Sequence, residues 1–231
     1  MATKLLSCGE VFMGAHLNIS GDSLDLADFD MAWGKRFLEA DLAGEEPPLE
    51  QMREALAESV AAHLGEHDPA AGPWGWKHPH AYLLLPFLDR AIPDLRFVHF
   101  VRDGRRMAFS PNQRQAQHYG DVVFGPEHER WEPYVLSIEF WSWANTRAAD
   151  YGEQHMGERY LRVRFEDICD EPERLCRQLI DFARGDRSAT DAQVREAAAL
   201  ISRPAPPKPS SKRLAEVQAR ASAGLTRFGY M

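Results

Sequence analysis

The stretch PDLRFVHFVRDGRRMAFS, residues 93–110, constrains the fold more than any other part of the chain. Its apolar run over 95–101 has the composition of a β-strand and ends at Arg102, and a helix is predicted directly after it, over 103–118. WGWK at 74–77 and RYLRVRF at 159–165 also read as strands. Strands that alternate with helices predict an α/β fold with a mainly parallel sheet.

The rest of the chain reads mostly as helices around that sheet. Residues 15–30 are rich in Asn, Ser and Asp and are expected to be irregular, and the Pro-rich stretch 203–211 reads as a stiff connector with one short helix after it. We expect a single domain over 1–231. The predicted helices cover 2–7 with Gly9 as the stop, 49–64, 81–91, 133–155, and DEPERLCRQLIDFARG with Pro172 near its start and Gly185 just past its end.

Charge is spread unevenly along the chain. Residues 1–100 carry 7 basic and 16 acidic side chains, a net charge of −9, while residues 101–231 carry 20 and 19. A chain with a net charge of −8 repels polyanions at long range, so we expect neither a general nucleic-acid binder nor a membrane-surface binder. Any anionic ligand has to be held by a local cluster of cations.

Cysteine content and hydropathy point to a cytoplasmic protein. Cys8, Cys169 and Cys176 lack metal-ligand spacing and read as thiols of a reducing compartment. No apolar run has the length of about 18 residues that a membrane span requires, and Glu10 interrupts the short apolar patch at the N-terminus.

Cationic side chains stand where an α/β sheet binds its ligands, beyond the C-terminal ends of the strands. Arg102 ends one predicted strand and Lys77 ends another, and Ser110 is placed about two turns into the helix that follows Arg102. A guanidinium beside a hydroxyl is suited to a phosphate group. The alternatives are an Arg102 paired with Asp103, Asp94 or Glu166, and solvated Arg105 and Arg106 side chains.

Four stretches resemble the sulfotransferase superfamily, whose donor is 3′-phosphoadenosine 5′-phosphosulfate. FVRDGRRMAFS is similar to its 3′-phosphate motif and WGWKHP to the Lys-x-Pro segment of its Golgi-type and bacterial members. YLRVRFEDICDEPE is similar to a further family segment, and LTRFGYM to the C-terminal Phe-Gly-Tyr of many bacterial members, which implies a bacterial source.

The resemblance implies a three-layer fold of the P-loop nucleotide-hydrolase-like type. Relatives open with a strand and a Gly/Ser-rich phosphosulfate loop, whereas MATKLLSCG looks like the helix that follows that loop. We therefore expect an N-terminally truncated version of the fold. The loop's backbone N–H groups are what hold the 5′-phosphosulfate.

The resemblance also assigns roles to residues. Lys77 is expected to stabilise charge on the transferring group, and His16 or His78 to be the general base, with His80, Glu10 or a group not named here as alternatives. The expected donor-binding residues are Arg102, Ser110, Phe165, Lys212 and Arg213. Phe165 would stack on adenine or pack in the core. The two basic residues would reach the 3′-phosphate or lie at a solvated helix N-terminus.

These assignments predict sulfuryl transfer from 3′-phosphoadenosine 5′-phosphosulfate to a hydroxyl or amine of a small or medium-sized acceptor, without a metal. The alternative is an inactive sulfotransferase-like domain that binds a nucleotide or a protein partner because the phosphosulfate loop is missing. A P-loop kinase is disfavoured, since Gly-x-x-x-x-Gly-Lys-[Ser/Thr] does not occur in the chain. The oligomeric state does not follow from the sequence.

Overall fold

Two parallel strands form the centre of the computed structural model, which describes residues 1–185 and 187–231. β1 (Phe97–Val101) pairs with β2 (Tyr160–Arg164), so that Val101 lies opposite Arg164. The parallel pairing predicted for these two segments is confirmed. In the described residues the sheet has only these strands, and the wider three-layer sheet stays a prediction. Residues 74–77 do not form a strand, because Trp74 makes only a single parallel bridge to Phe12.

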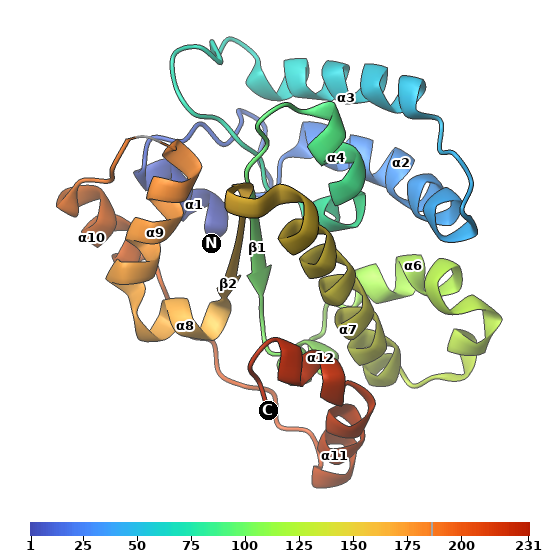
Figure 1. Ribbon diagram of the computed structural model, residues 1–231. Coiled ribbons are helices and arrows are strands. Elements are labelled where there is room, and N and C mark those ends of the chain that lie inside the picture. The colour runs from blue at the N-terminus through green and yellow to red at the C-terminus, as the bar shows by residue number, and fades with distance from the viewer. Residues whose placement is uncertain (186) are drawn as a thin grey trace.

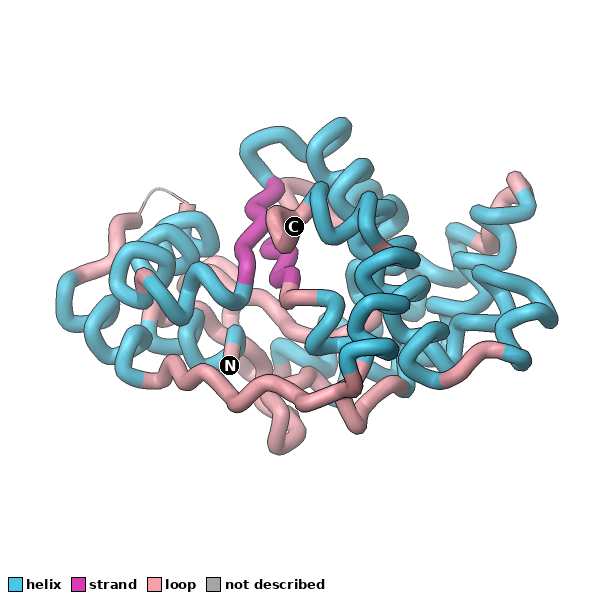
Figure 2. Tube along the Cα trace, turned by 90° about the horizontal axis from the view of Figure 1, so that it is seen from below, coloured by secondary structure: helices cyan, strands magenta, loops and turns pink. Residues whose placement is uncertain are grey.

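Helices pack on both faces of the two strands (Figures 1 and 2). Side chains alternate along a strand, so Val98 and Phe100 face one apolar cluster while Val101 faces another. The first cluster is built with α1 (Ala2–Cys8), α8 (Phe165–Asp170), α9 (Pro172–Arg184) and α10 (Asp191–Ala199). The second is built with α5 (Gly104–Ala108), α7 (Pro133–Tyr151), α11 (Ser211–Arg220) and α12 (Ser222–Arg227).

The remaining helices pack on α7 or on one another. They are α2 (Leu24–Ala43), α3 (Leu49–Leu64), α4 (Leu85–Ala91) and α6 (Arg114–Phe124). Short 3₁₀ turns cover Ala81–Leu84, Gly125–Arg130 and Gly157–Arg159, and one π-helical turn covers Gly152–Met156. No helix in the described ranges combines the length and apolarity that a membrane crossing requires.

The helix predicted over 103–118 is wrong as a single element. α5 ends at Ala108 and α6 begins at Arg114, and Ser110 lies in the segment between them. Pro111 explains the break, because proline has no N–H to donate and disfavours helical geometry in the residue before it. Ser110 is therefore a loop residue and does not lie two turns into a helix.

The expectation of irregular structure over 15–30 is also wrong in its second half. Ser23 caps α2 by accepting a hydrogen bond from the Leu26 N–H at 3.3 Å. Leu26 and Phe29 then point into a core shared with α3 and α4. Asp25 in the first turn is favoured by the helix dipole, so an acidic start is compatible with a helix.

The glycines and prolines predicted at helix ends do lie at helix ends in the structure. Gly9 has a negative φ, and Glu10 takes the positive φ of 59° in its place; Gly9 is required because a Cβ there would lie 2.4 Å from a methyl of Ile180. The helix predicted with Pro172 near its start and Gly185 just past its end is confirmed as α9, and Gly185 has a φ of 77°. The Pro-rich connector is followed by two short helices, α11 and α12.

Candidate active site

Arg102 and Phe165 meet at the C-terminal ends of the two strands. Each directly follows its strand, and the register of Val101 with Arg164 brings them side by side. The guanidinium carbon of Arg102 lies 4.9 Å from the centre of the Phe165 ring, within cation–π distance. Its Nε is buried and has no hydrogen-bond partner in the described part of the chain. A buried donor without a partner is costly unless a ligand or water supplies the acceptor.

The three carboxylates that could neutralise Arg102 do not pair with it. Asp103 caps α5 and binds Arg105 instead, whose guanidinium reaches the carboxylate at 2.7 and 3.0 Å. Glu166 accepts from other donors, and Asp94 lies in the turn before β1, at the opposite end of the strand. Arg105 is thus occupied in an ion pair, whereas Arg102 forms none with the described residues.

Ser110 lies beside an aromatic pair rather than on a helix. Its Oγ accepts the Asn112 N–H at 3.3 Å, and its neighbour Phe109 stacks on Tyr134 of α7 with 5.5 Å between ring centres. The guanidinium of Arg213 covers the same Tyr134 ring at 5.2 Å. The structure therefore brings Arg213, from the far end of the sequence, to the loop that carries Ser110.

Lys212 and Arg213, the two basic residues assigned to the donor site, lie in the first turn of α11. Ser210 caps the helix through the Arg213 N–H at 3.4 Å, and α11 packs against α5 and α7. Lys212 is exposed and forms no ion pair within the ranges that the structure describes. Both cations are thus carried on a helix that lies against the element following Arg102.

Lys77 is held by a carboxylate that the sequence reading did not identify. Its ammonium group forms an ion pair with Asp22, and its carbonyl accepts the Ser23 N–H at 3.0 Å. Burial pushes the pKa of Asp22 upward, but the hydrogen bonds from Lys77 and Asn18 outweigh it and hold the pKa below its ordinary value. In this conformation the Lys77 charge is neutralised within the protein.

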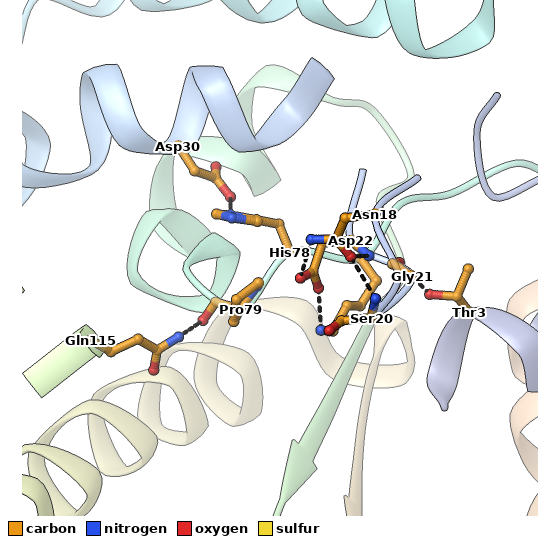
Figure 3. Close-up of polar contacts among 10 residues, drawn as sticks. Thr3, Asn18, Ser20, Gly21, Asp22, Asp30, His78, Pro79 and Gln115 are labelled. Atoms are coloured by element: carbon orange, nitrogen blue, oxygen red, sulfur yellow. Dashed lines mark hydrogen bonds and ion pairs between the residues drawn. The ribbon is translucent and has the colours of Figure 1, made fainter. Parts of the chain in front are cut away.

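The loop that carries Asp22 is shaped by Asn18. The Asn18 Oδ1 accepts the N–H groups of Ser20 and Asp22 at 2.8 and 3.0 Å, and its amide donates to Asp22 Oδ2 at 2.9 Å (Figure 3). Thr3 of α1 donates to the Gly21 carbonyl at 2.6 Å. These hydrogen bonds hold the loop in the conformation in which Asp22 pairs with Lys77.

His78 points away from Lys77, toward α2. Its Nδ1 lies 2.5 Å from Oδ2 of Asp30, and the side chains are only 8% and 1% exposed (Figure 3). Burial raises the pKa of Asp30, and the His78 contact acts in the opposite direction. Neighbouring His80 accepts or donates a 3.2 Å hydrogen bond with the Tyr119 hydroxyl, and burial lowers its pKa to about 4. His80 is thus neutral at neutral pH.

His16, unlike His78 and His80, is exposed to solvent. Its side chain is 66% exposed, and its Nδ1 lies 3.4 Å from Asp25 Oδ2. Both histidines proposed as the base thus have a carboxylate neighbour, but only His78 is buried with it. The alternative Glu10 is exposed and lies 3.8 Å from Arg184.

Sequence reasoning missed Asp22 and Asp30, and it considered Glu166 only as a partner of Arg102. Tyr230 carried a signal, since it belongs to the Phe-Gly-Tyr tail, but no role followed from it. The structure places its hydroxyl 2.7 Å from Glu166 Oε2. Within the described ranges no group of three or more His, Cys, Asp or Glu side chains is arranged to hold a metal ion.

Comparison with known proteins gives one match. The family model described as the sulfotransferase family matches residues 18–187, which include Lys77, Arg102 and Phe165. No curated protein and no solved structure matches the chain. The family match covers well over half of the sequence, and the chain therefore belongs to the sulfotransferase family.

Proposed function

We propose that the chain transfers a sulfuryl group from 3′-phosphoadenosine 5′-phosphosulfate to a hydroxyl or amine of a small or medium-sized acceptor. Membership of the sulfotransferase family supports the reaction class. The observation that carries the choice of donor is Arg102, a guanidinium at the rim of a parallel sheet with a buried Nε and no carboxylate partner in the described residues. A phosphate is the ligand that such a group is best suited to bind.

The surrounding side chains fit a 3′-phosphorylated adenine nucleotide. Ser110, Lys212 and Arg213 can add a hydroxyl and two cations from the α5–α6 loop and the start of α11. Arg102 covers one face of Phe165, so a stacked adenine would use the other face of that ring. No metal is required by this set of residues, because cationic side chains can supply the charge stabilisation.

In the transfer step these residues position the reactants and stabilise charge. A bond forms between the acceptor oxygen or nitrogen and sulfur while the bond from sulfur to the phosphate oxygen breaks. Lys77 would leave its ion pair with Asp22 and stabilise the negative charge that develops on the leaving phosphate. His78 or His16 would take the acceptor proton, each beside its own carboxylate.

Arg102→Ala tests the donor site. Titration calorimetry with adenosine 3′,5′-bisphosphate is expected to show binding weakened by about 2–4 kcal/mol, because a charge-assisted contact to phosphate is lost. Arg53→Ala is the matched control, since Arg53 is an exposed arginine of α3 that pairs with Glu50 at 3.0 Å. Donor-dependent sulfate transfer to a panel of hydroxyl and amine compounds is the accompanying activity assay. Equal affinity of the two variants would remove Arg102 from the donor site.

A further inference from the structure

Tyr230, the residue before the C-terminal Met231, returns to the rim of the sheet beside Arg102. Its side chain is 7% exposed and packs against Trp141 of α7. Its hydroxyl lies 2.7 Å from Glu166 Oε2 and 3.2 Å from the Val101 carbonyl. The C-terminus lies past the lower ends of the two strands in Figure 1, and beside the strands in the perpendicular view of Figure 2.

Both oxygens of Glu166 are occupied by donors that flank Arg102. The Tyr230 hydroxyl reaches Oε2, and the Asp103 N–H lies 3.4 Å from Oε1. The carboxylate thus lies along the backbone between Val101 and Asp103, next to the residue whose charge it could neutralise. The Arg102 guanidinium nevertheless lies on the Phe165 ring and forms no ion pair with Glu166.

A carboxylate held this close to the Arg102 backbone could pair with the Arg102 guanidinium in a two-bond fork if it turned toward it. The hydroxyl of Tyr230 competes for the same carboxylate oxygen. Burial raises the pKa of Tyr230, and the hydrogen bond to Glu166 raises it further, so the hydroxyl remains protonated and able to donate. Because it has one proton, the shorter contact to the charged acceptor takes it in preference to the Val101 carbonyl.

Asp103, the other carboxylate next to Arg102, is also held by hydrogen-bond donors. Asp103 is bound by its own helix, through the Arg105 N–H at 2.9 Å, and by the Arg105 guanidinium. Each carboxylate beside Arg102 therefore has a dedicated partner, Arg105 for one and Tyr230 for the other. Of these two partners, only Tyr230 is neutral, so it restrains Glu166 without adding a second positive charge.

We propose that Tyr230 is a positioning residue that holds Glu166 away from Arg102 and so keeps the guanidinium open to the 3′-phosphate of the nucleotide. The identity of the ligand rests on the proposed function. The tail of the chain thereby takes part in the donor site without touching the donor.

Tyr230→Phe tests this inference, because it removes the hydroxyl and retains the ring packing. Affinity for adenosine 3′,5′-bisphosphate is expected to fall about ten-fold as Glu166 turns to Arg102, in line with the loss of one charge-assisted hydrogen bond. Affinity for adenosine 5′-monophosphate, which lacks the 3′-phosphate, is expected to stay the same. Tyr151→Phe is the matched control, since Tyr151 donates to Asp89 at 3.0 Å on a different part of the molecule.

Glu166→Gln distinguishes positioning from a general structural role. In the double variant Tyr230→Phe, Glu166→Gln the competing charge is gone, so bisphosphate affinity is expected to return to within about two-fold of the Glu166→Gln single variant. If the double variant binds as weakly as Tyr230→Phe, the hydroxyl acts by stabilising the fold and the inference is overturned.

A crystal structure of Tyr230→Phe without nucleotide gives a readout that does not depend on the ligand. An ion pair between Glu166 and Arg102 is expected there, and an unmoved Glu166 would overturn the inference even where the donor site stands. Conversely, a wild-type protein that binds no bisphosphate would refute the proposed donor, while this structure would still decide what Tyr230 does to Glu166.

Discussion

Lys77 is the residue whose structural setting most affects its chemistry. Its partner Asp22 is 13% exposed, while Lys77 itself is 36% exposed. Removing the lysine alone would strand a mostly buried carboxylate, so a simple truncation mixes two effects, the loss of a catalytic charge and the loss of an ion pair. The two effects can be separated only if the carboxylate is neutralised as well.

Lys77→Ala is therefore compared with the double variant Lys77→Ala, Asp22→Asn. We expect both to lower kcat by about 100-fold or more while nucleotide affinity changes little, because the lysine acts on charge that develops in the transfer step. Lys77→Ala alone is expected to lower the free energy of unfolding by ~1 kcal/mol, and the double variant to recover it. Steady-state kinetics and urea unfolding measure the two effects. Turnover that recovers together with stability would show that Lys77 is only a structural partner of Asp22.

At the scale of elements, the sequence predicted those that carry a clear period. β1, β2 and α3 were foreseeable because their apolar residues recur at strand or helix spacing over enough residues. α2 was not, because its start is polar and its capping residue Ser23 is held by His63, which lies 40 positions away in the sequence. The break between α5 and α6 is caused by Pro111, which the sequence shows. It was not predicted because the apolar and basic residues around Pro111 resemble one continuous helix.

The contacts of the candidate site also fall into those that the sequence predicts and those that it does not. Arg102 and Phe165 each follow a predicted strand, so parallel pairing was enough to place them together. The contacts of Glu166 with Tyr230, and of Lys77 with Asp22, join residues 64 and 55 positions apart. Such contacts depend on how loops and the C-terminal tail fold back, and no periodicity in the sequence encodes them.

The start of α2 is fixed by one buried hydrogen-bonded chain. His63 donates its Nε2–H to the Gly75 carbonyl at 3.0 Å, so its Nδ1 accepts the Ser23 hydroxyl at 2.8 Å. Ser23 Oγ in turn accepts the Leu26 N–H. The chain ties α2, α3 and the segment before Lys77 together. Burial lowers the pKa of His63, which keeps the imidazole in the neutral form that this arrangement needs.

Ser23→Ala is expected to destabilise the protein by about 2 kcal/mol, since it removes a helix cap and leaves the Nδ1 of His63 without its donor. Ser210→Ala is the control, because Ser210 caps α11 in the same way but is exposed and bonds no histidine. We expect about 1 kcal/mol or less for it. Urea unfolding of the two variants gives the comparison, and equal losses would show that the His63 contact adds nothing.

On the scale of the whole molecule, His99 joins the sheet to the helical layer. It lies on β1, donates its Nε2–H to Asn145 of α7 at 2.9 Å and accepts the Tyr160 hydroxyl of β2 at 2.7 Å. The Asn145 amide donates to the Trp141 carbonyl, which leaves its Oδ1 as the acceptor. Both ring nitrogens are thus used in the neutral form, and a second proton would leave the Tyr160 hydroxyl facing a donor.

This arrangement makes stability depend on pH. Burial lowers the pKa of His99 from 6.5 to about 4. The unfolded chain therefore binds a proton at His99 once the pH falls below about 6.5, while the folded protein does not until about pH 4. The contribution of His99 to the free energy of unfolding is fully present above pH 6.5. It is lost as the pH falls toward about 4, and the total loss is on the order of 3 kcal/mol.

His99→Gln is expected to flatten this dependence, because glutamine keeps a donor and an acceptor but does not titrate. Between pH 6 and pH 4.5 the free energy of unfolding of the wild type should fall more steeply, by about 1.4 kcal/mol per pH unit, the value for one proton. His80, with a pKa also lowered to about 4, titrates in both proteins and so cancels from the difference. His155→Gln, at an exposed histidine of the π-helical turn, is expected to keep the wild-type slope. Identical slopes for His99→Gln and His155→Gln would mean that the sheet and α7 are not joined through a neutral imidazole.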